Sequence, residues 1–189
     1  MFKKTLFVLL LVSTTVQARE LAGITVEEQI KLGASELTLN GAGVRTKFVF
    51  DVYVAAFYTQ SAVKAVSALN MQQPMRMAMH FVYDEVSKEK LVDAWNNGFD
   101  DNLSSDQYAV LKNKIKQFNA LFETVHKGDV IWLDYTPEKG TAVSINKNEK
   151  GVVDGADFYK ALLLIWLGED PAGERLKKSL LGKANSEDE

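Results

Sequence analysis

The chain has 189 residues, of which 47% are hydrophobic and 25% charged, an ordinary composition for one globular domain. It contains no cysteine, which excludes disulfides, thiolate metal sites and a cysteine nucleophile. Acidic residues outnumber lysine and arginine by 25 to 22, and no basic stripe is available to neutralise phosphates, so we expect no nucleic-acid partner.

The first residues have the pattern of a secretory signal peptide. Two lysines precede an apolar run over residues 6–12, and a small-residue site ending at Ala18 follows. The run is much shorter than the roughly 20 apolar residues that a membrane-spanning helix needs. We therefore expect a signal peptide over residues 1–18 and a single domain over residues 19–189. After cleavage the protein would have no stable membrane anchor and would be periplasmic or secreted.

Short strands are expected at residues 21–26 and 30–32, before one long stretch over residues 39–59. This stretch opens with Asn40-Gly41-Ala42-Gly43, which predicts a turn because glycine readily adopts positive φ. The run that follows has the pattern of one β-strand with an apolar face. Its opposite face carries Arg45, Lys47, Val49, Asp51, Tyr53, Ala55 and Phe57. Such a face is either half solvated or borders a cavity that contains polar groups.

The next expected elements are a short connecting helix at residues 60–69 and a second strand at residues 75–83. One face of that strand carries three methionines, Met75, Met77 and Met79. Methionine side chains are flexible and adapt to irregular neighbours. This face is therefore either ordinary core packing or the wall of a site for a flexible apolar ligand.

The second half of the chain has two amphipathic helical patterns, then a run of short strands, then an apolar helix. The expected ranges are helices at 87–102 and 105–125, strands at 130–135, 141–145 and 151–153, and helices at 158–167 and 171–181. Strands with mostly hairpin-type connections around a helical middle predict an α+β domain with an antiparallel sheet.

No motif for nucleotide binding, zinc hydrolysis or serine hydrolysis occurs in the chain. The two histidines, His80 and His126, have no partner motif, and His126 is expected at the C-terminus of a helix. We expect no metal and no cofactor. The remaining candidate is Arg45, because a guanidinium suits a carboxylate and is costly to bury without an anion. Tyr53 lies so far along an extended strand that a site shared with Arg45 requires a turn or bulge between them.

The stretch LNGAGVRTKFVFDVYVAAFYT over residues 39–59 resembles the signature of the bacterial chalcone isomerase-like proteins. The glycine-rich segment, the arginine after Gly43 and the Val-Tyr-x-x-x-x-Tyr run ending at Tyr58 match that family. Weaker similarity continues through VSKEKLVDAWNNGF and LLLIWLGEDPAGERLKKSLLG. The resemblance implies an open-faced β-sandwich, in which a large antiparallel sheet carries a layer of helices and a ligand cleft lies between the layers.

The family includes enzymes, and in true chalcone isomerases the counterpart of Arg45 stabilises the anion formed during cyclisation. The resemblance places the other polar groups of those enzymes on Tyr53, Val86-Ser87, Ala94-Trp95, and Ile165 or Leu164. Most of these polar groups are therefore missing from this chain. We expect weak isomerase activity or none.

The superfamily also includes fatty-acid binders, which resemble this chain in keeping an arginine and a strand tyrosine that hold the carboxylate. These two residues match Arg45 and Tyr53. The expected function is non-catalytic binding of a small amphipathic acid such as a fatty acid, with its tail against Met75, Met77 and Met79. The alternatives are an isomerase-type lyase, and a structural or protein-interaction domain in which Arg45 pairs permanently with an internal carboxylate.

Overall fold

The structure is a computed structural model that describes residues 18–183. The predicted signal peptide therefore lies almost wholly outside the described residues, as does the tail from residue 184. Within the described part, one antiparallel sheet has the strand order β11-β10-β9-β6-β5-β4-β3. Its strands are β3 (Gln29–Leu32), β4 (Ser35–Lys47), β5 (Phe50–Thr59), β6 (Met75–Phe81), β9 (Val130–Thr136), β10 (Gly140–Ile145) and β11 (Asn148–Val153).

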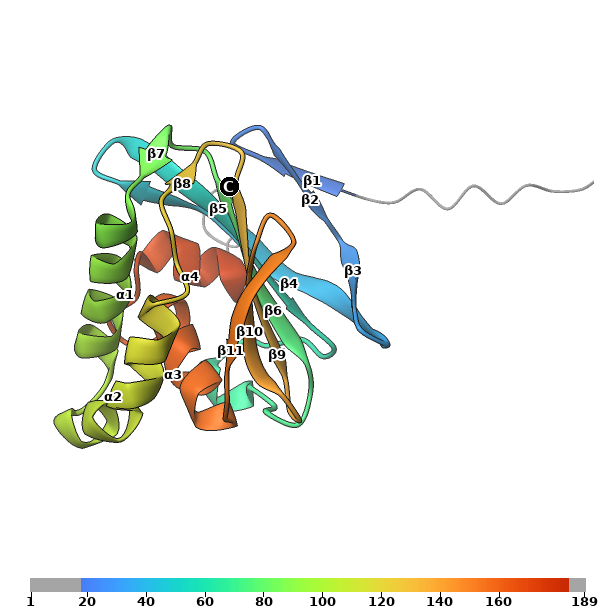
Figure 1. Cartoon of the computed structure of the whole chain (residues 1–189). Helices are drawn as coiled ribbons and strands as arrows, with labels where there is room; N and C mark the ends of the chain where they lie inside the picture. The colour runs from blue at the N-terminus through green and yellow to red at the C-terminus, as the bar shows by residue number, and fades with distance from the viewer. Residues whose placement is uncertain (1–17, 184–189) are drawn as a thin grey trace, which may run out of the picture.

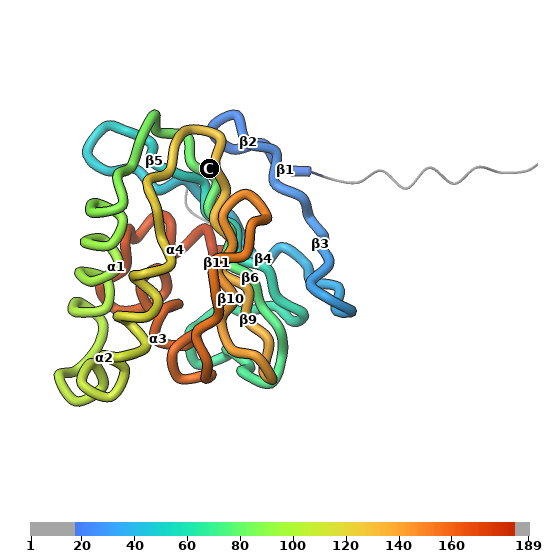
Figure 2. The backbone as a smooth tube through the Cα atoms, viewed as in Figure 1, coloured from blue at the N-terminus to red at the C-terminus, as the bar shows by residue number. Residues whose placement is uncertain are grey.

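The helices cover one face of this sheet, and a β-hairpin lies on the other side (Figure 1; the backbone is traced in Figure 2). The helices are α1 (Lys88–Asn102), α2 (Ser105–Asn119), α3 (Ala156–Leu167) and α4 (Glu174–Leu180). The hairpin on the outer side consists of β1 (Ala18–Leu21) and β2 (Ile24–Glu27), and a small separate pair consists of β7 (Glu85–Val86) and β8 (Val125–His126). This arrangement confirms the predicted α+β fold with an antiparallel sheet and a helical layer.

From Tyr53 onward both faces of β5 are buried, whereas Phe50 and Asp51 at its start are exposed, so the half-solvated alternative holds only for the first part of the mixed face. Tyr53, Ala55 and Phe57 belong to the main core between the sheet and the helices. Val54 and Ala56 belong to a smaller core on the outer side, which includes Val26 of β2 and has the partly buried Leu21 of β1 packed against it. The alternation of a strand thus gives each layer its own set of apolar side chains.

Helix α1 has the predicted amphipathic form. Its N-terminus is capped by Ser87, whose side chain accepts a hydrogen bond from the backbone N–H of Lys90. Leu91, Trp95 and Phe99 are buried, as their spacing of four residues requires. The helix therefore lies with these three side chains toward the sheet and α3. No helix in residues 18–183 is long and apolar enough to span a membrane.

The stretch over residues 39–59 is a hairpin, so the predicted turn at residues 40–43 followed by a single strand is wrong. Strand β4 continues through the glycines, and the chain reverses at Phe48-Val49. The glycines are needed for packing, because α4 lies directly on β4. A Cβ atom on Gly41 would clash with the carbonyl oxygen of Ser179, and one on Gly43 would lie 2.7 Å from the Ser179 Cβ.

Three predicted helices are shorter than expected, and the last of them, expected at residues 171–181, is α4 over Glu174–Leu180, which starts after Gly173 and not at Pro171. Residues 60–69 contain only a 3-10 turn at Val66–Ala68, because Asn40 holds the backbone of Val63 through hydrogen bonds to its N–H and its C=O. Helix α2 ends at Asn119, although apolar residues continue at helical spacing beyond it. His126 is therefore not at a helix terminus but in β8, where it pairs with Glu85.

Candidate ligand-binding site

The hairpin between β4 and β5 brings together two residues that the sequence separates. Arg45 and Tyr53 are direct cross-strand partners on the inner face of the sheet. Tyr53 is in turn the partner of Phe81 on β6, with ring centroids 5.6 Å apart. The reversal of the chain at Phe48-Val49 therefore supplies the turn that a shared site requires.

A pocket of about 730 Å³ lies between this part of the sheet and α1. Arg45, Tyr53 and Phe81 contribute to its wall from the sheet, together with Met79. From the helical side it is lined by Val86, Leu91, Ala94, Trp95, Gly98 and Ile165, and by the loop residues Asp170, Pro171 and Ala172. Such a volume is in the size range of small-molecule sites, and the lining combines apolar side chains with seven charged ones.

Arg45 has few partners inside the protein. Its Nη1 donates a hydrogen bond to the carbonyl oxygen of the adjacent Thr46 at 2.7 Å. Asp51 instead accepts a bond from the Thr46 hydroxyl at 2.7 Å, and no carboxylate of the described residues lies within ion-pair distance of Arg45. The permanent internal pair of the structural alternative is therefore absent. Most of the five donors of this half-buried guanidinium remain available to a ligand.

Tyr53 adds a second donor next to Arg45. Its side chain is buried, and its hydroxyl oxygen accepts a hydrogen bond from the indole N–H of Trp166 at 3.0 Å. Burial raises the pKa of Tyr53 to about 12, against smaller lowering effects from the Trp166 hydrogen bond and the charge of Arg45. The phenol is thus neutral at physiological pH and keeps its hydroxyl proton.

Of the three methionines predicted to line the site, only Met79 does so. Met75 and Met77 are buried in the main core, 2% and 0% exposed, because the pocket reaches only one end of β6. At the other end α3 covers the sheet, and its Tyr159 is hydrogen-bonded to the carbonyl of Leu133, the cross-strand partner of Met77. For Met75 and Met77, core packing is the correct alternative.

Charges of both signs surround the pocket. Lys47 and Lys90 are exposed, and the carboxylates that line it are Glu85, Asp93, Asp101 and Asp170. Exposed charges are screened by water and salt, whereas a half-buried charge is screened less. Arg45 is therefore the cation that an anionic group inside the pocket would meet at close range.

Most of the positions that the family resemblance aligns with the polar groups of chalcone isomerases line this pocket; Leu164 and Ser87 do not, and the Ser87 hydroxyl caps α1. Val86, Ala94, Trp95 and Ile165 all line it, and none carries a hydroxyl or amide group. Trp95 does carry an indole N–H, which is buried and has no hydrogen-bond partner among the described residues. Asn97 places an amide in the wall as well, and sequence comparison did not single it out.

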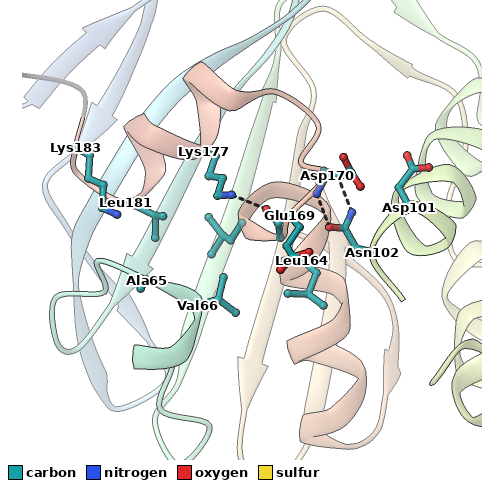
Figure 3. A pocket seen from close by; sticks show the side chains of 12 residues that line it. Ala65, Val66, Asp101, Asn102, Leu164, Glu169, Asp170, Lys177, Leu181 and Lys183 are labelled. Atoms are coloured by element: carbon teal, nitrogen blue, oxygen red, sulfur yellow. Dashed lines mark hydrogen bonds between the residues drawn. The ribbon is translucent and has the colours of Figure 1, made fainter. Parts of the chain in front are cut away.

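A second pocket of about 500 Å³ lies between the 3-10 turn, the C-terminal ends of α1 and α3, and α4 (Figure 3). Two of its polar side chains, Lys177 and Asn102, form hydrogen bonds with the protein backbone. Lys177 donates to the carbonyl oxygen of Gly168 at 2.7 Å, and Asn102 exchanges hydrogen bonds with the backbone of Asp170 (Figure 3). It offers no unpaired cation comparable with Arg45, and we assign the site to the larger pocket.

Sequence reasoning missed some of the residues that form the site. The spacing of Leu91 and Trp95 identified both as buried, but nothing in the sequence showed that they lie opposite Arg45. Trp166 was missed as the partner of Tyr53, because 113 residues separate them. No group of three or more potential metal-ligating side chains occurs within the described residues.

Comparison with known proteins supports a family assignment. The model of the family described as chalcone isomerase-like matches residues 18–182. A search of curated proteins found no match. Among solved structures, a fatty-acid binding protein of Arabidopsis thaliana is similar, with a TM-score of 0.67 at 19% sequence identity, covering 89% of this chain and 97% of that one. Because the family model spans nearly all of the described residues, the chain belongs to the chalcone isomerase-like family.

Proposed function

We propose that this protein binds a small amphipathic carboxylic acid, such as a fatty acid, without transforming it. The ligand carboxylate would accept hydrogen bonds from Arg45 and Tyr53, and its hydrocarbon part would lie between the sheet and α1. Val52, Phe81, Leu91, Trp95 and Ile165 would contact the hydrocarbon part, and Met79 would be the methionine in contact with it.

The observation that carries this proposal is that Arg45 is partly buried and has no carboxylate partner among the described residues. It is a half-buried guanidinium without a carboxylate partner, in the wall of a pocket of about 730 Å³. A desolvated charge without a counter-ion is unfavourable, and a ligand carboxylate would remove that cost. The similar Arabidopsis structure is that of a fatty-acid binding protein, which agrees with this proposal, although at 19% identity the likeness concerns the fold.

The absence of catalysis is proposed from the residues at the aligned positions. Val86, Ala94 and Ile165 have no group that could orient or protonate a substrate. Arg45 and Tyr53 can hold an anion, but the Tyr53 phenol is a poor proton acceptor, and its pKa of about 12 disfavours the phenolate. Turnover of a chalcone above its spontaneous rate would contradict this part of the proposal.

The binding proposal is tested by titrating delipidated protein with a long-chain fatty acid and measuring heat or the displacement of a fluorescent fatty acid. We expect Arg45→Ala to weaken binding roughly 10- to 100-fold, since it removes charge-assisted hydrogen bonds. Arg175→Ala is the matched control, because Arg175 is exposed on α4 and does not line the pocket. Equal affinity for wild type and Arg45→Ala would refute the proposed carboxylate site, and no binding at all would refute the function.

We also propose that residues 1–18 are a cleaved signal peptide and that the protein works in the periplasm or after secretion. Ala18 is the first residue of β1, where it pairs with Glu27, so cleavage after it would leave the rest of the hairpin in place. Intact-mass measurement on protein from fractionated cells tests this. The expected N-terminus is Arg19, and a full-length cytoplasmic product would contradict it.

A further inference from the structure

The tip of the β4–β5 hairpin is an exposed apolar surface. Phe48, Val49 and Phe50 are 90%, 83% and 55% exposed; the first two form the reversal of the chain and Phe50 begins β5. The tip projects at one end of the molecule, beside β7 and near the start of α1 (Figure 1). Tyr83, 39% exposed, stands edge-on to Phe50 with ring centroids 5.8 Å apart. Large apolar side chains that are this exposed and this close together commonly mark a surface that binds a partner or a membrane.

The backbone of the tip is also unfavourable for the residue that occupies it. Phe48 has a φ of +57°, at the first position of a two-residue hairpin loop where glycine or asparagine is usually found. A bulky side chain in this region is strained, and strained residues gather where function requires them. A small polar turn would remove both the exposed apolar side chains and the backbone strain at Phe48. The residues at the tip therefore lower the stability of the fold.

The tip is continuous with the ligand pocket. Phe48, Phe50 and Tyr83 line the pocket as well as facing solvent, so its apolar wall extends outward to the tip without a polar break at these residues. Val49 is the tip residue that does not line the pocket. A hydrocarbon chain entering or leaving along this side would therefore pass the aromatic rings of the tip.

The size of the tip favours a bilayer over a protein partner. A stable protein interface buries about 800 Å² from each partner, and the three exposed side chains present roughly half of that. Shallow insertion of a few aromatic residues is how proteins bind the boundary between headgroups and acyl chains, where tyrosine and other aromatic rings are favoured. Lys47 precedes the tip and is exposed, which suits a lipid phosphate.

We propose that Phe48, Val49 and Phe50 insert reversibly into the surface of a phospholipid bilayer, so that the pocket exchanges its ligand directly with the membrane. The docking step stands on the tip alone, whereas the exchange step rests on the proposed function. The membrane contact is peripheral and involves no spanning segment.

Two assays separate these steps. Flotation with vesicles of phosphatidylethanolamine and phosphatidylglycerol measures docking, and transfer of a fluorescent fatty acid from the same vesicles measures exchange. Val49→Asp introduces a charge at the centre of the tip without altering a residue that lines the pocket, and we expect it to reduce vesicle binding roughly tenfold. Val49→Trp should strengthen vesicle binding. Val110→Asp is the matched control, because Val110 is 77% exposed on α2 and does not line the pocket.

The proposal holds if Val49→Asp loses vesicle binding and transfers fatty acid more slowly, while its affinity for fatty acid in solution equals that of wild type. If neither wild type nor the variants bind fatty acid in solution, but Val49→Asp still loses vesicle binding, docking stands and the proposed function fails. If wild type does not bind vesicles, or Val49→Asp and Val49→Trp bind them as wild type does, docking is overturned. A dimer in sedimentation that Val49→Asp dissociates would overturn it too, because the tip would then contact a second copy of the chain.

Discussion

The sheet carries two arginines on opposite faces, and their surroundings differ. Arg76, on the outer face of β6, forms two hydrogen bonds with the carboxylate of Asp134, at 2.5 and 2.6 Å, and lies 4.4 Å from the ring centroid of Trp132. Arg45, on the inner face of β4, has one hydrogen bond, to the carbonyl of its neighbour Thr46. The outer arginine has a carboxylate partner in the protein, and the inner one has none among the described residues.

The difference separates a structural charge from one available to a ligand. Arg76 and Asp134 are 12% and 14% exposed, so each compensates the other where water is largely excluded. Arg45 lies at a pocket, next to a phenol that stays protonated. From this contrast we expect removal of the partner of Arg76 to destabilise the fold, and removal of Arg45 to weaken ligand binding alone.

The largest effect is expected from Asp134→Ala. It leaves the guanidinium of Arg76 buried without a counter-ion, which should lower the free energy of unfolding by about 3–5 kcal/mol. Urea denaturation monitored by tryptophan fluorescence measures this loss. Glu123→Ala is the control, because it breaks an exposed pair with Lys150 and should cost about 1 kcal/mol or less. The folded fraction of Asp134→Ala should bind fatty acid as wild type does, and a large loss of affinity would contradict separate roles for the two arginines.

The second effect concerns Arg45 itself. Arg45→Ala should weaken fatty-acid binding by about 2 kcal/mol, while its stability without ligand stays within about 0.5 kcal/mol of wild type or rises. Arg45→Lys keeps the charge but loses the planar fork of donors, so its affinity should lie between the two. Parallel calorimetric titration and urea denaturation measure both quantities. A loss of stability as large as that of Asp134→Ala would show that Arg45 has a structural partner after all.

The fold could be predicted from the sequence because its apolar periodicities are local. The spacing of Leu91, Trp95 and Phe99 identifies the buried face of α1 whatever that face packs against. The alternation of side chains in β5 and β6 identifies the buried faces of these strands in the same way. The family resemblance then supplied the layered arrangement. The signal peptide and the location of the protein stay predictions, because residues 1–17 lie outside the described part.

The site was harder to predict because it depends on long-range placement. The glycines at positions 41 and 43 suggested a turn, but their function is to admit α4, which lies more than 130 residues further along the chain. The true reversal at Phe48-Val49 contains no glycine and has no turn signal in the sequence. Arg45 and Tyr53 were therefore identified as candidates, whereas their direct pairing came only from the register of β4 and β5.

The smallest predicted effect is a loss of stability at alkaline pH that follows from the raised pKa of Tyr53. Its value of about 12 in the folded protein exceeds the ordinary value of 10, so between these pH values the folded state keeps a proton that the unfolded state releases. The contribution of Tyr53 to stability is therefore unaffected below pH 10 and is lost as the pH rises toward 12. At pH 11 the loss amounts to about 1 kcal/mol, which Tyr53→Phe should not show.

The measurement compares urea denaturation at pH 7 and pH 11 for wild type and Tyr53→Phe. The comparison between two pH values is needed because the variant also deprives the Trp166 N–H of its acceptor, an effect that is the same at both. Tyr58→Phe is the matched control: burial raises the pKa of Tyr58 to about 12 as well, but Tyr58 belongs to the core on the outer side of the sheet. Both variants should lose less unfolding free energy between pH 7 and pH 11 than wild type does. Only Tyr53→Phe should weaken fatty-acid binding, about fivefold for one lost hydrogen bond. If the two tyrosines behave alike toward the ligand, Tyr53 does not share a site with Arg45.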